Sequence, residues 1–532
     1  MNGDGLIETS QLKDLPVVLA QTKGVHDRTD VVHPLLERRH TGNGVGEARS
    51  SLVEQDQPRE RSKPSQGPGA GGLLPPVLHV GDETGDEDEV ERAITESLIS
   101  DGDIAAPRIP GFGQHSSSLR CLALSRQGRM ECPTYTRRMT SVAKLAEIVD
   151  RRRDEFLDSL REMVNIDCGS FSPAGVNRIA DLCAQRFSAG GWEIERRPHE
   201  PGEGDGKLGD LLIGRLSGVG GPDVMLLGHM DTVFSDGTAR ERPFHTEGDR
   251  AFGPGVSDMK SGLLAGIFAV EALQEVGEEG FGSITYVCNP DEEIGSPFSG
   301  TVIRQLAADV DVAYVLEAAR ENGELVSARK GVSDARIDIT GRAAHAGAYP
   351  ERGRSAVLEA AHKIIALHAL NQRWPGVTVN VGVVSGGTRP NVVAADCRLE
   401  VDIRAEDEAT LAEAEAEVGR IAENHVVHDV TVSLLSRSWH RPMERTPTSA
   451  RLVEVAKELA AELGFAVEDT ASGGASDGNT TAAAGVPTLD GLGPIGGDWH
   501  GPEEWLDLAS VTPRVALLAA MIARAGEALT GS

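Results

Sequence analysis

The residues of this chain with the clearest capacity for chemistry are two histidines and five acidic residues, each inside a short motif. In chain order they are His229, Asp231, Asp258, Glu292, Glu293, Glu317 and His500. Imidazole nitrogens and carboxylate oxygens bind divalent zinc well, and a carboxylate has two oxygens with which to bridge two ions. This combination therefore predicts a hydrolase that works with a pair of zinc-like ions.

The first motif, GHMDTV, follows an apolar run and contains His229 and Asp231. If the chain stays extended, Asp231 lies on the same side as His229 and can accept a hydrogen bond from its second ring nitrogen. Asp258 lies in the glycine-rich motif GPGVSDMKSG, just ahead of a helical pattern. It can either bridge two ions or cap that helix.

The motif NPDEEIGS carries two adjacent glutamates. Adjacent residues of a strand point to opposite faces, so Glu292 and Glu293 can serve one site only from a turn, which the following Gly-Ser-Pro sequence favours. One can bind metal while the other acts as a general base, although sequence chemistry alone does not order them. We assign Glu292 as the base and Glu293 as the ligand. Glu317 ends an apolar run in YVLEAAR, and His500 lies in the glycine-rich loop IGGDWHGPEEW.

Apolar runs typical of buried strands lead to most of these motifs. The runs cover residues 211–216, 224–229, 283–289 and 312–318. Helical patterns separate them, and the clearest spans 260–276. Buried strands that alternate with helices predict a mixed or parallel α/β sheet. Because such sheets bind ligands at the carboxyl ends of their strands, we expect the motifs to meet along one edge.

The pattern changes between residues 329 and 440. Expected strands cover 333–342, 377–387, 397–405 and 431–438, and expected helices cover 355–369 and 408–422. A β-α-β-β-α-β order predicts a ferredoxin-like sandwich. Because His500 lies beyond this region, the chain must return to the first domain, and we expect an inserted second domain. The predicted division is therefore a catalytic domain at 139–328 and 441–532, with the inserted domain at 329–440.

Residues 1–138 lack sustained periodicity and are rich in Pro, Gly, Ser and acidic residues. Such a segment cannot bury enough apolar surface to offset its conformational entropy, so we expect disorder. The alternative is that translation starts near Met139 and that this stretch is not part of the protein. Order is expected from Thr140 onward, with helices at 142–164 and 176–189.

The composition argues against several classes of protein. A formal net charge of −30 is unfavourable for a nucleic-acid partner, because duplex binding needs a basic surface. No run approaches the roughly 18 apolar residues of a membrane helix, and the N-terminus lacks the apolar core of a signal peptide. Six cysteines without a CxxC pair predict reduced thiols. We therefore expect a cytoplasmic protein without a membrane or nucleic-acid partner.

Taken together, the motifs GHMDTV, AFGPGVSDMKSG, NPDEEIGS, VLEAAR, RAAHAG and WHGPEE resemble those of a zinc metallopeptidase family. That family contains aminoacylase, acetylornithine deacetylase and bacterial glutamate carboxypeptidase, and the likeness is greatest to its folate-cleaving carboxypeptidase branch. The match covers about residues 140–530. It implies an α/β catalytic domain of the zinc-dependent exopeptidase type with an inserted ferredoxin-like α+β dimerisation domain, or lid.

The resemblance also implies a role for each residue of the metal site. His229 and Glu317 match the ligands of one Zn²⁺, Glu293 and His500 match those of the other, Asp258 matches the bridge, Glu292 the general base, and Asp231 the residue that orients the first histidine. Co²⁺ or Mn²⁺ could replace Zn²⁺. A cis peptide bond is expected at Asp258–Met259, where Met259 replaces the aspartate often found in the family.

In the inserted domain, His345 of RAAHAG matches a histidine that reaches across a homodimer to polarise the scissile carbonyl. Asn380 and Arg404 match residues that contact the terminal carboxylate of the substrate, a task that suits the planar fork of arginine. Lys330, Arg441 and Gly474, in the loop SGGASDG, are further candidates for substrate contact.

The expected activity is cleavage of an amide or peptide bond next to a free carboxylate, with C-terminal glutamate favoured. The substrate would be a small peptide or an N-acyl amino acid. The alternatives are an N-acyl-amino-acid deacylase of the aminoacylase or acetylornithine deacetylase type, a di- or tripeptidase and, more remotely, a metal-binding family member without catalysis.

Overall fold

The computed structural model describes residues 141–202 and 206–530 of the 532-residue chain. The N-terminal stretch 1–138, for which we predicted disorder or a later translation start, lies outside the described residues. Cys121 and Cys132 lie outside them as well.

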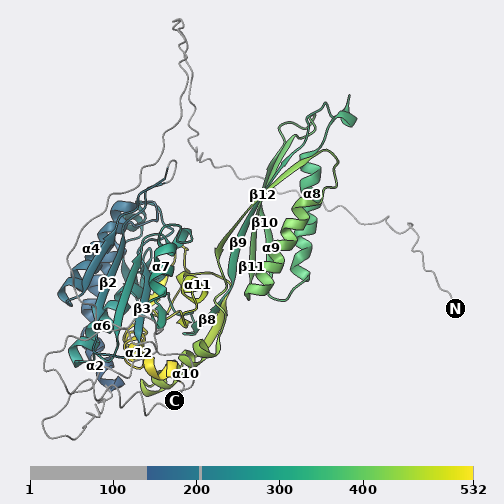
Figure 1. The fold of residues 1–532 in the computed structure, drawn as a ribbon. Helices are drawn as coiled ribbons and strands as arrows, with labels where there is room; N and C mark the ends of the chain where they lie inside the picture. Colours follow the sequence, from purple (N-terminus) through teal and green to yellow (C-terminus); the bar gives the residue numbers. More distant parts are fainter. Residues whose placement is uncertain (1–140, 203–205, 531–532) are drawn as a thin grey trace, which may run out of the picture. The chain divides into compact units, whose positions relative to one another are not determined.

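A six-stranded mixed sheet forms the centre of the catalytic region, in the order β1-β2-β6-β3-β7-β14 (Figure 1). The strands are β1 (Glu193–Arg197), β2 (Leu211–Ser217), β3 (Asp223–His229), β6 (Ser283–Asn289), β7 (Val312–Val315) and β14 (Thr488–Leu489). Strands β6, β3, β7 and β14 run parallel, whereas β1 and β2 extend the sheet with antiparallel pairings. The mixed α/β sheet expected from the apolar runs is therefore confirmed.

The parallel strands direct the predicted site residues to one edge of the sheet. Strand β3 ends at His229, and β6 ends just before the Glu292–Glu293 pair. Strand β7 ends at Val315 and not at residue 318 as predicted. Its pairing with β3 stops at Leu227, so Glu317 already lies in the loop that follows the strand.

Two helices of the catalytic region, α6 (Ser261–Val276) and α12 (Val511–Ala523), pack against each other and are buried over most of their surface. The single helix expected at 142–164 is instead two, α2 (Val142–Arg151) and α3 (Arg153–Val164). The break at Arg152 falls in the sequence DRRRDE, which offers no apolar side chain to hold a continuous helix against the core.

Of the remaining helices of the catalytic region, only the first, α4, was predicted from the sequence. They are α4 (Pro173–Ala189), α5 (Thr238–Glu241), α7 (Ser299–Ala307), α10 (Pro447–Glu462), α11 (Asp477–Ala483) and α13 (Ala525–Thr530). The prediction started α4 at residue 176, but the helix begins at Pro173, whose fixed φ suits the first turn.

Two small sheets complete the catalytic region, and neither was predicted. One has the order β15-β16-β5-β4, and the other pairs β13 with β8. Their strands are β4 (His245–Glu247), β5 (Arg250–Phe252), β8 (Leu325–Arg329), β13 (Asp469–Ser472), β15 (Gly496–Gly497) and β16 (Trp505–Asp507). Most of these strands are too short to show a period-2 pattern in the sequence.

The region after β8 forms a separate four-stranded antiparallel sheet in the order β10-β11-β9-β12. Its elements are β9 (Gly331–Thr340), α8 (Ala356–Ala369), β10 (Thr378–Gly386), β11 (Asp396–Ala405), α9 (Glu408–Glu423) and β12 (Thr431–His440). The strict alternation of buried residues along β9 turns one face of the sheet toward α8 and α9. The predicted β-α-β-β-α-β sandwich is confirmed.

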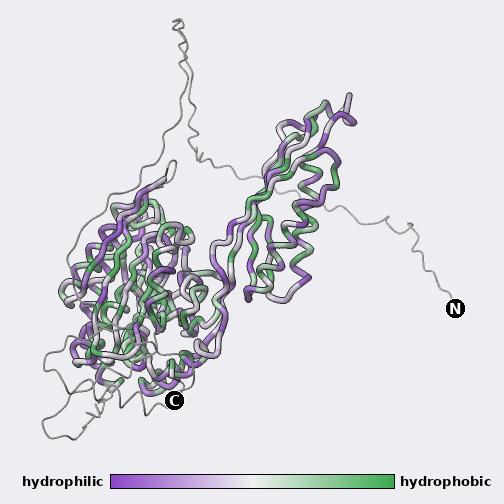
Figure 2. The backbone as a smooth tube through the Cα atoms, viewed as in Figure 1, coloured by the Kyte–Doolittle hydropathy of each residue, from purple (hydrophilic) through white to green (hydrophobic). Residues whose placement is uncertain are grey.

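Each region has its own apolar core. One core contains residues between 335 and 422, and the main core of the catalytic region draws on residues 142–325 and 452–528. In Figure 2, hydrophobic residues gather along the central strands and the helices that cover them. This separation supports the proposed domain limits near residues 328 and 440.

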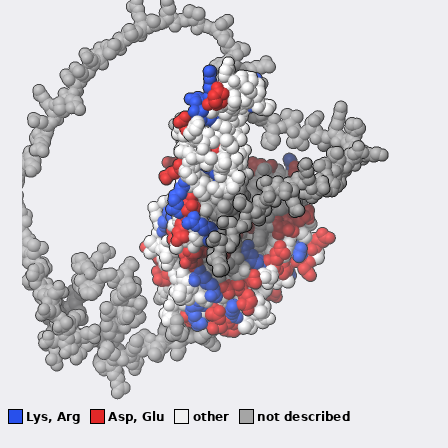
Figure 3. Space-filling model, turned by 90° about the vertical axis from the view of Figure 1, so that its right-hand side faces the viewer, with Lys and Arg blue, Asp and Glu red and all other residues white. Residues whose placement is uncertain are grey.

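On the face of the molecule in Figure 3, acidic side chains are interspersed with basic ones over the described surface. No helix in the described part of the chain has both the length and the apolar character needed to cross a bilayer. The described cysteines are Cys168, Cys183, Cys288 and Cys397, and all four are buried free thiols.

Candidate metal centre and active site

His229, the last residue of β3, has an exposed fraction of only 1%. Its Nδ1 lies 2.9 Å from the main-chain oxygen of Asp231 and 3.5 Å from that residue's carboxylate. The predicted contact between the two residues is present, but its shorter form uses the peptide oxygen. Because a peptide oxygen only accepts, Nδ1 carries the hydrogen and Nε2 is the atom presented to a metal.

The Asp231 carboxylate has a second task that the motif did not reveal. It accepts hydrogen bonds from the Ser170 hydroxyl at 2.7 Å and from the backbone N–H groups of Glu292 and Glu293 at 3.1 and 3.2 Å. One buried carboxylate therefore links the end of β3 to the acidic turn that follows β6.

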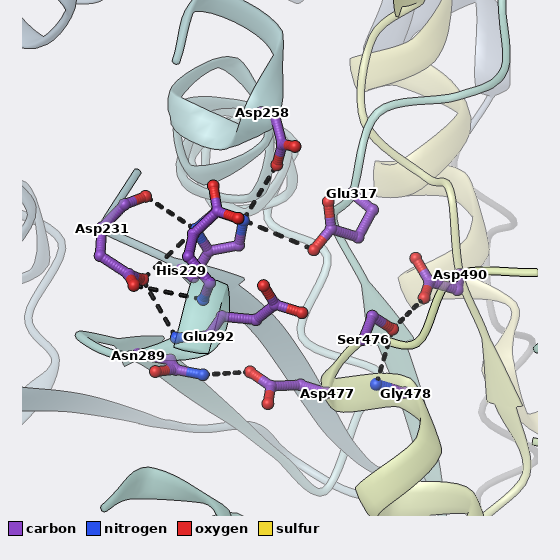
Figure 4. Close-up of polar contacts among 12 residues, drawn as sticks. His229, Asp231, Asp258, Asn289, Glu292, Glu317, Ser476, Asp477, Gly478 and Asp490 are labelled. Atoms are coloured by element: carbon purple, nitrogen blue, oxygen red, sulfur yellow. Dashed lines mark hydrogen bonds and ion pairs between the residues drawn. The ribbon is translucent and has the colours of Figure 1, made fainter. Parts of the chain in front are cut away.

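That turn is a short 3₁₀ helix, Glu292–Ile294, which confirms the expectation that both glutamates leave the strand on a turn. The preceding Asp291 accepts from the backbone N–H of Phe298 at 2.6 Å. Asp477, at the start of α11, accepts from the hydroxyl of Ser296 at 2.6 Å and from the amide of Asn289. The side chains of Asp231, Asp291 and Asp477 thus fix the acidic turn. Figure 4 shows Asp231 beside the turn and Asp477 in contact with Asn289.

Asp258 lies in a loop whose backbone needs glycine, since Gly253 and Gly255 have φ values of 142° and 71°. The expected cis peptide bond at Asp258–Met259 is present. The N-cap of α6 is Lys260, so the alternative role of Asp258 as a helix cap does not apply. Its carboxylate turns toward the two histidines instead.

The predicted ligands form two groups of three that share Asp258. In the first group, His229 Nε2 lies 3.1 Å from Asp258 Oδ1 and 3.6 Å from Glu317 Oε1. In the second, His500 Nε2 lies 3.3 Å from Asp258 Oδ2 and 3.1 Å from Glu293 Oε2. Asp258 thus directs one oxygen to each group, which is the arrangement of a bridging carboxylate. Figure 4 shows the first group converging from three segments of the chain.

The electrostatics of the cluster fit cations. Within residues 141–202 and 206–530, no Lys or Arg side chain forms an ion pair with Asp258, Glu293 or Glu317. Burial raises the pKa of Glu317 to about 8. Hydrogen bonds to Asp258 and Glu293 raise the pKa of His500 to about 10. Among the described residues, these three carboxylates therefore have histidine but no Lys or Arg as an ionic partner. Imidazole together with carboxylate is a set of side chains that zinc-type ions prefer.

Glu292 differs from the residues of both groups. Its carboxylate forms no hydrogen bond with the described part of the chain, and Figure 4 shows it beside His229, on the side of Asp477. Burial raises the pKa of Glu292 well above its ordinary value, and the neighbouring Glu317 adds to the effect. It is therefore a carboxylate without a hydrogen-bond partner among the described residues, next to the two groups of predicted ligands.

The sequence also missed a buried ion pair that supports the glycine-rich loop. The Arg329 guanidinium lies 2.6 Å from Asp490 and donates to the main-chain oxygen of Gly474 at 3.0 Å. Asp490 also accepts from the Ser476 hydroxyl at 2.6 Å. Gly474 and Ser476, in the middle of the loop, are therefore both tied to one charge pair, which no local motif could indicate.

Arg404, on β11, contacts the same loop by donating to the oxygen of Gly473 at 2.9 Å, while its Nε lies 3.0 Å from Asp402. Asn380, on β10, is exposed. Lys330 donates to the oxygen of Gly376 at 2.6 Å, and Arg441 lies within 3.5 Å of Glu408. The structure thus brings Arg404 to the glycine-rich loop, whereas Lys330 and Arg441 are engaged elsewhere.

His345 is an exposed residue of the inserted domain. Its Nδ1 accepts from the backbone N–H groups of Gly347 and Ala348 at 3.2 and 3.1 Å. In the neutral imidazole the hydrogen therefore lies on Nε2, which can donate to a partner outside the loop. None of the contacts described for His345 joins it to the two metal-ligand groups.

Comparison with known proteins agrees with this geometry. A sequence model described as Peptidase family M20/M25/M40 matches residues 225–524, which is more than half of the chain. The chain is 27% identical over 372 residues to carboxypeptidase G2 of Pseudomonas sp., covering 69% of this chain and 88% of that protein. It is 28% identical over 355 residues to a succinyl-diaminopimelate desuccinylase of Leptothrix cholodnii, covering 62% and 89%.

Among solved structures, an aminopeptidase PepT of Bacillus cereus aligns with a TM-score of 0.59 at 22% identity. The alignment covers 70% of this chain and 98% of that one, and it supports the fold. With the match to the family extending over both ligand groups and the acidic turn, this chain belongs to peptidase family M20/M25/M40 and is a metal-dependent hydrolase of peptide or amide bonds.

Proposed function

We propose that this protein is a di-zinc hydrolase of the carboxypeptidase type, which cleaves an amide bond next to a free carboxylate and favours C-terminal glutamate. The observation that carries the proposal is the sharing of Asp258 by two groups of three ligands, His229 with Glu317 and Glu293 with His500. Three protein ligands for each ion leave coordination positions open for water and substrate. Catalytic zinc sites have such open positions, whereas structural zinc sites are filled by protein ligands.

The proposed holders of the two ions are the five residues of these groups, with Zn²⁺ as the metal and Co²⁺ or Mn²⁺ as substitutes. When bound, such a pair would supply Lewis acidity that activates a water molecule and polarises the substrate carbonyl. The main-chain oxygen of Asp231 holds His229 in the tautomer that presents Nε2, and the carboxylate of Asp231 holds the turn that carries Glu293. The site is thus organised from the protein side before any substrate binds.

Glu292 is the proposed general base. Its carboxylate takes a proton from the attacking water and then returns it to the leaving amine, which restores the enzyme. A free carboxylate beside the ligand groups is suited to this task, because no hydrogen bond within the described chain has to break before it accepts the proton. The buried surroundings also raise its affinity for the proton during the step.

Two of the proposed substrate contacts, Arg404 and Asn380, lie on the inserted domain. Arg404 and Asn380 would bind the free carboxylate, with Gly474 of the adjoining loop close to Arg404 through Gly473. Lys330 and Arg441 remain weaker candidates, since each already has a partner. The preference for C-terminal glutamate draws support from the similarity to carboxypeptidase G2.

His345 is proposed to donate from Nε2 to the scissile carbonyl across a homodimer. The exposed position of His345 and its fixed tautomer support this role. A homodimer is further supported by apolar side chains exposed on the inserted domain, among them Ile365 on α8 and Leu435 on β12, which are 70% and 66% exposed. The four described free thiols favour a reducing compartment, and we propose the cytoplasm.

A second candidate is an N-acyl-amino-acid deacylase. The support for this candidate is the similarity to the desuccinylase of Leptothrix cholodnii. Its sequence identity to this chain is 28%, against 27% for carboxypeptidase G2. The chemistry at the amide bond would be the same, and only the groups on either side of it would differ.

The test is hydrolysis by the purified, zinc-loaded protein of a panel with and without chelator. The panel holds a folate-type glutamate amide, several N-acetyl amino acids, N-acetylornithine, N-succinyl-diaminopimelate and a dipeptide. Chelator-sensitive cleavage that is fastest for the glutamate amide is the expected result. Faster cleavage of an N-acyl amino acid would move the protein to the second candidate, and no cleavage of any member would contradict both.

A further inference from the structure

Glu504 lies four positions after His500 in the motif WHGPEEW, and its side chain is buried, with an exposed fraction of 1%. Its carboxylate accepts four hydrogen bonds from one loop. Oε2 accepts from the backbone N–H of Gly255 at 2.8 Å, and Oε1 accepts from the backbone N–H groups of Ser257 and Asp258, both at 2.9 Å. The Ser257 hydroxyl donates to Oε1 at 3.2 Å. The loop that carries the bridging aspartate is therefore tied to a single carboxylate.

The small sheet β15-β16-β5-β4 brings Glu504 to this position. Trp505 on β16 pairs with Phe252 on β5, so Glu504 comes opposite the start of the glycine-rich loop at Gly253. On the other side of β16, Gly496 lies so close to Ser257 that a Cβ on this glycine would meet the serine side chain at 2.3 Å. This sheet thus packs the segment around His500 closely against the loop that carries Asp258.

We infer that Glu504 is the positioning residue of the metal bridge: it fixes the backbone of Asp258 so that one carboxylate oxygen faces each ligand group. The inference rests on the proposed two-metal function and goes further by naming what sets the geometry of the bridge. Glu504 itself is not a ligand, because its oxygens are occupied by the loop.

This role has a signature that an ordinary structural carboxylate would not have. Asp258 is common to both ligand groups, whereas Glu317 belongs to one and Glu293 to the other. Displacing Asp258 therefore weakens both metal positions together, while the loss of Glu317 weakens only one. Outer contacts of this kind typically change metal affinity by about 10- to 100-fold.

The informative variant is Glu504→Gln, which keeps the size of the side chain. If the remaining oxygen keeps its contacts with Ser257 and Asp258, the new amide group faces the N–H of Gly255, and two donors oppose each other. Glu503→Gln is the matched control, because Glu503 is the residue next to Glu504 and its side chain is exposed. Glu317→Gln is the one-site reference.

The measurement is titration of chelator-stripped protein with Co²⁺, followed by its visible absorption, together with competition against a chelator. We expect Glu504→Gln to lower the affinity for each of the two Co²⁺ ions by about tenfold or more. The visible absorption that accompanies the binding of each ion should also change. Glu503→Gln should match the wild type, and Glu317→Gln should lose one ion. If Glu504→Gln does not fold, Glu504→Asp, which withdraws the carboxylate by one methylene, serves in its place.

Unchanged affinities in Glu504→Gln, or a loss confined to one ion, would overturn the inference. The proposed function fails separately, through the wild type. A wild-type protein that binds fewer than two Co²⁺ ions contradicts the two-metal proposal whatever the variant does.

Discussion

Two groups of buried charges in this chain are neutralised in opposite ways. In the inserted domain, the carboxylate of Glu359, which is fully buried, lies 2.9 Å from the ammonium group of Lys363. It also accepts from the backbone N–H groups of Val426 and Val427. In the catalytic domain, Asp258 and Glu317 have only histidine as an ionic partner among the described residues.

The ammonium group of Lys363 also contacts the backbone. It donates to the main-chain oxygens of Ile421, Ala422 and Asn424 at 2.9 to 3.1 Å, where α9 ends. The buried carboxylates of Glu359 and Asp490 are thus each paired with a cation from the chain, Lys363 and Arg329. At the edge of the central sheet the chain supplies additional carboxylates instead, which is what a site for external cations requires.

The largest expected effect is on catalysis, and it comes from Glu292→Gln. The amide cannot take a proton, so kcat should fall by about 10²- to 10⁴-fold while the protein still binds two metal ions, because Glu292 belongs to neither ligand group. Steady-state kinetics and metal analysis of the same sample check both parts. Loss of a metal ion together with activity would show that Glu292 is a ligand and that the assignment is wrong.

Lys363→Met tests the structural role of the buried Glu359–Lys363 ion pair in the inserted domain. Without the ammonium group, Glu359 keeps a buried charge and the carbonyls at the end of α9 lose their donor, so the free energy of unfolding should fall by about 3–5 kcal/mol. Denaturant unfolding measures the change. Lys144→Met, at a side chain that is 50% exposed, is the control and should cost less than about 0.5 kcal/mol. Equal losses in the two variants would contradict the structural role of the pair.

Metal removal separates the two groups of charges without any mutation. An ion held at a hundred times its Kd stabilises the folded state by about 2.7 kcal/mol, so adding chelator should lower the Tm of the wild type. The shift should persist in Lys363→Met and shrink in Glu317→Gln, which loses one carboxylate ligand. A Tm that does not respond to chelator would contradict the proposal that the carboxylates of the catalytic domain bind metal ions.

Arg404 differs from both groups of buried charges, because its guanidinium is partly exposed and forms an ion pair with Asp402. Arg404→Lys should raise KM about tenfold with little change in kcat, since a lysine cannot make the paired hydrogen bonds of the arginine fork to a carboxylate. The control is a substrate whose terminal carboxylate is replaced by an amide. If KM rises equally for that substrate, Arg404 does not recognise the carboxylate.

The elements with strong periodicity could be predicted from the sequence, and so could the convergence of the ligands. The inserted sandwich follows from alternation along β9 and β11 and from two helices of ordinary length. The end of β3 at His229 follows from one buried run. These features depend on contacts that repeat within a short stretch of chain, which is the information that periodicity carries.

The supports of the site could not be predicted in this way. Glu504 is far along the chain from the loop that it holds, and the pairing that brings it there involves strands of two or three residues. Asp477 and its contact with Ser296 connect segments that are equally remote. Such contacts are visible only once the fold has placed the segments together, and each sequence motif taken alone has an ordinary structural explanation.

We propose that the carboxylates of Asp258, Glu293 and Glu317, which have no Lys or Arg partner among the described residues, hold two metal ions for hydrolysis. The most direct test is to strip the protein with chelator, return Zn²⁺ stepwise, and follow bound zinc and hydrolysis of the glutamate amide in the same sample. We expect two ions to bind per chain and activity to return as they bind. Full hydrolysis in the stripped protein, or saturation without a second ion, would contradict this proposal.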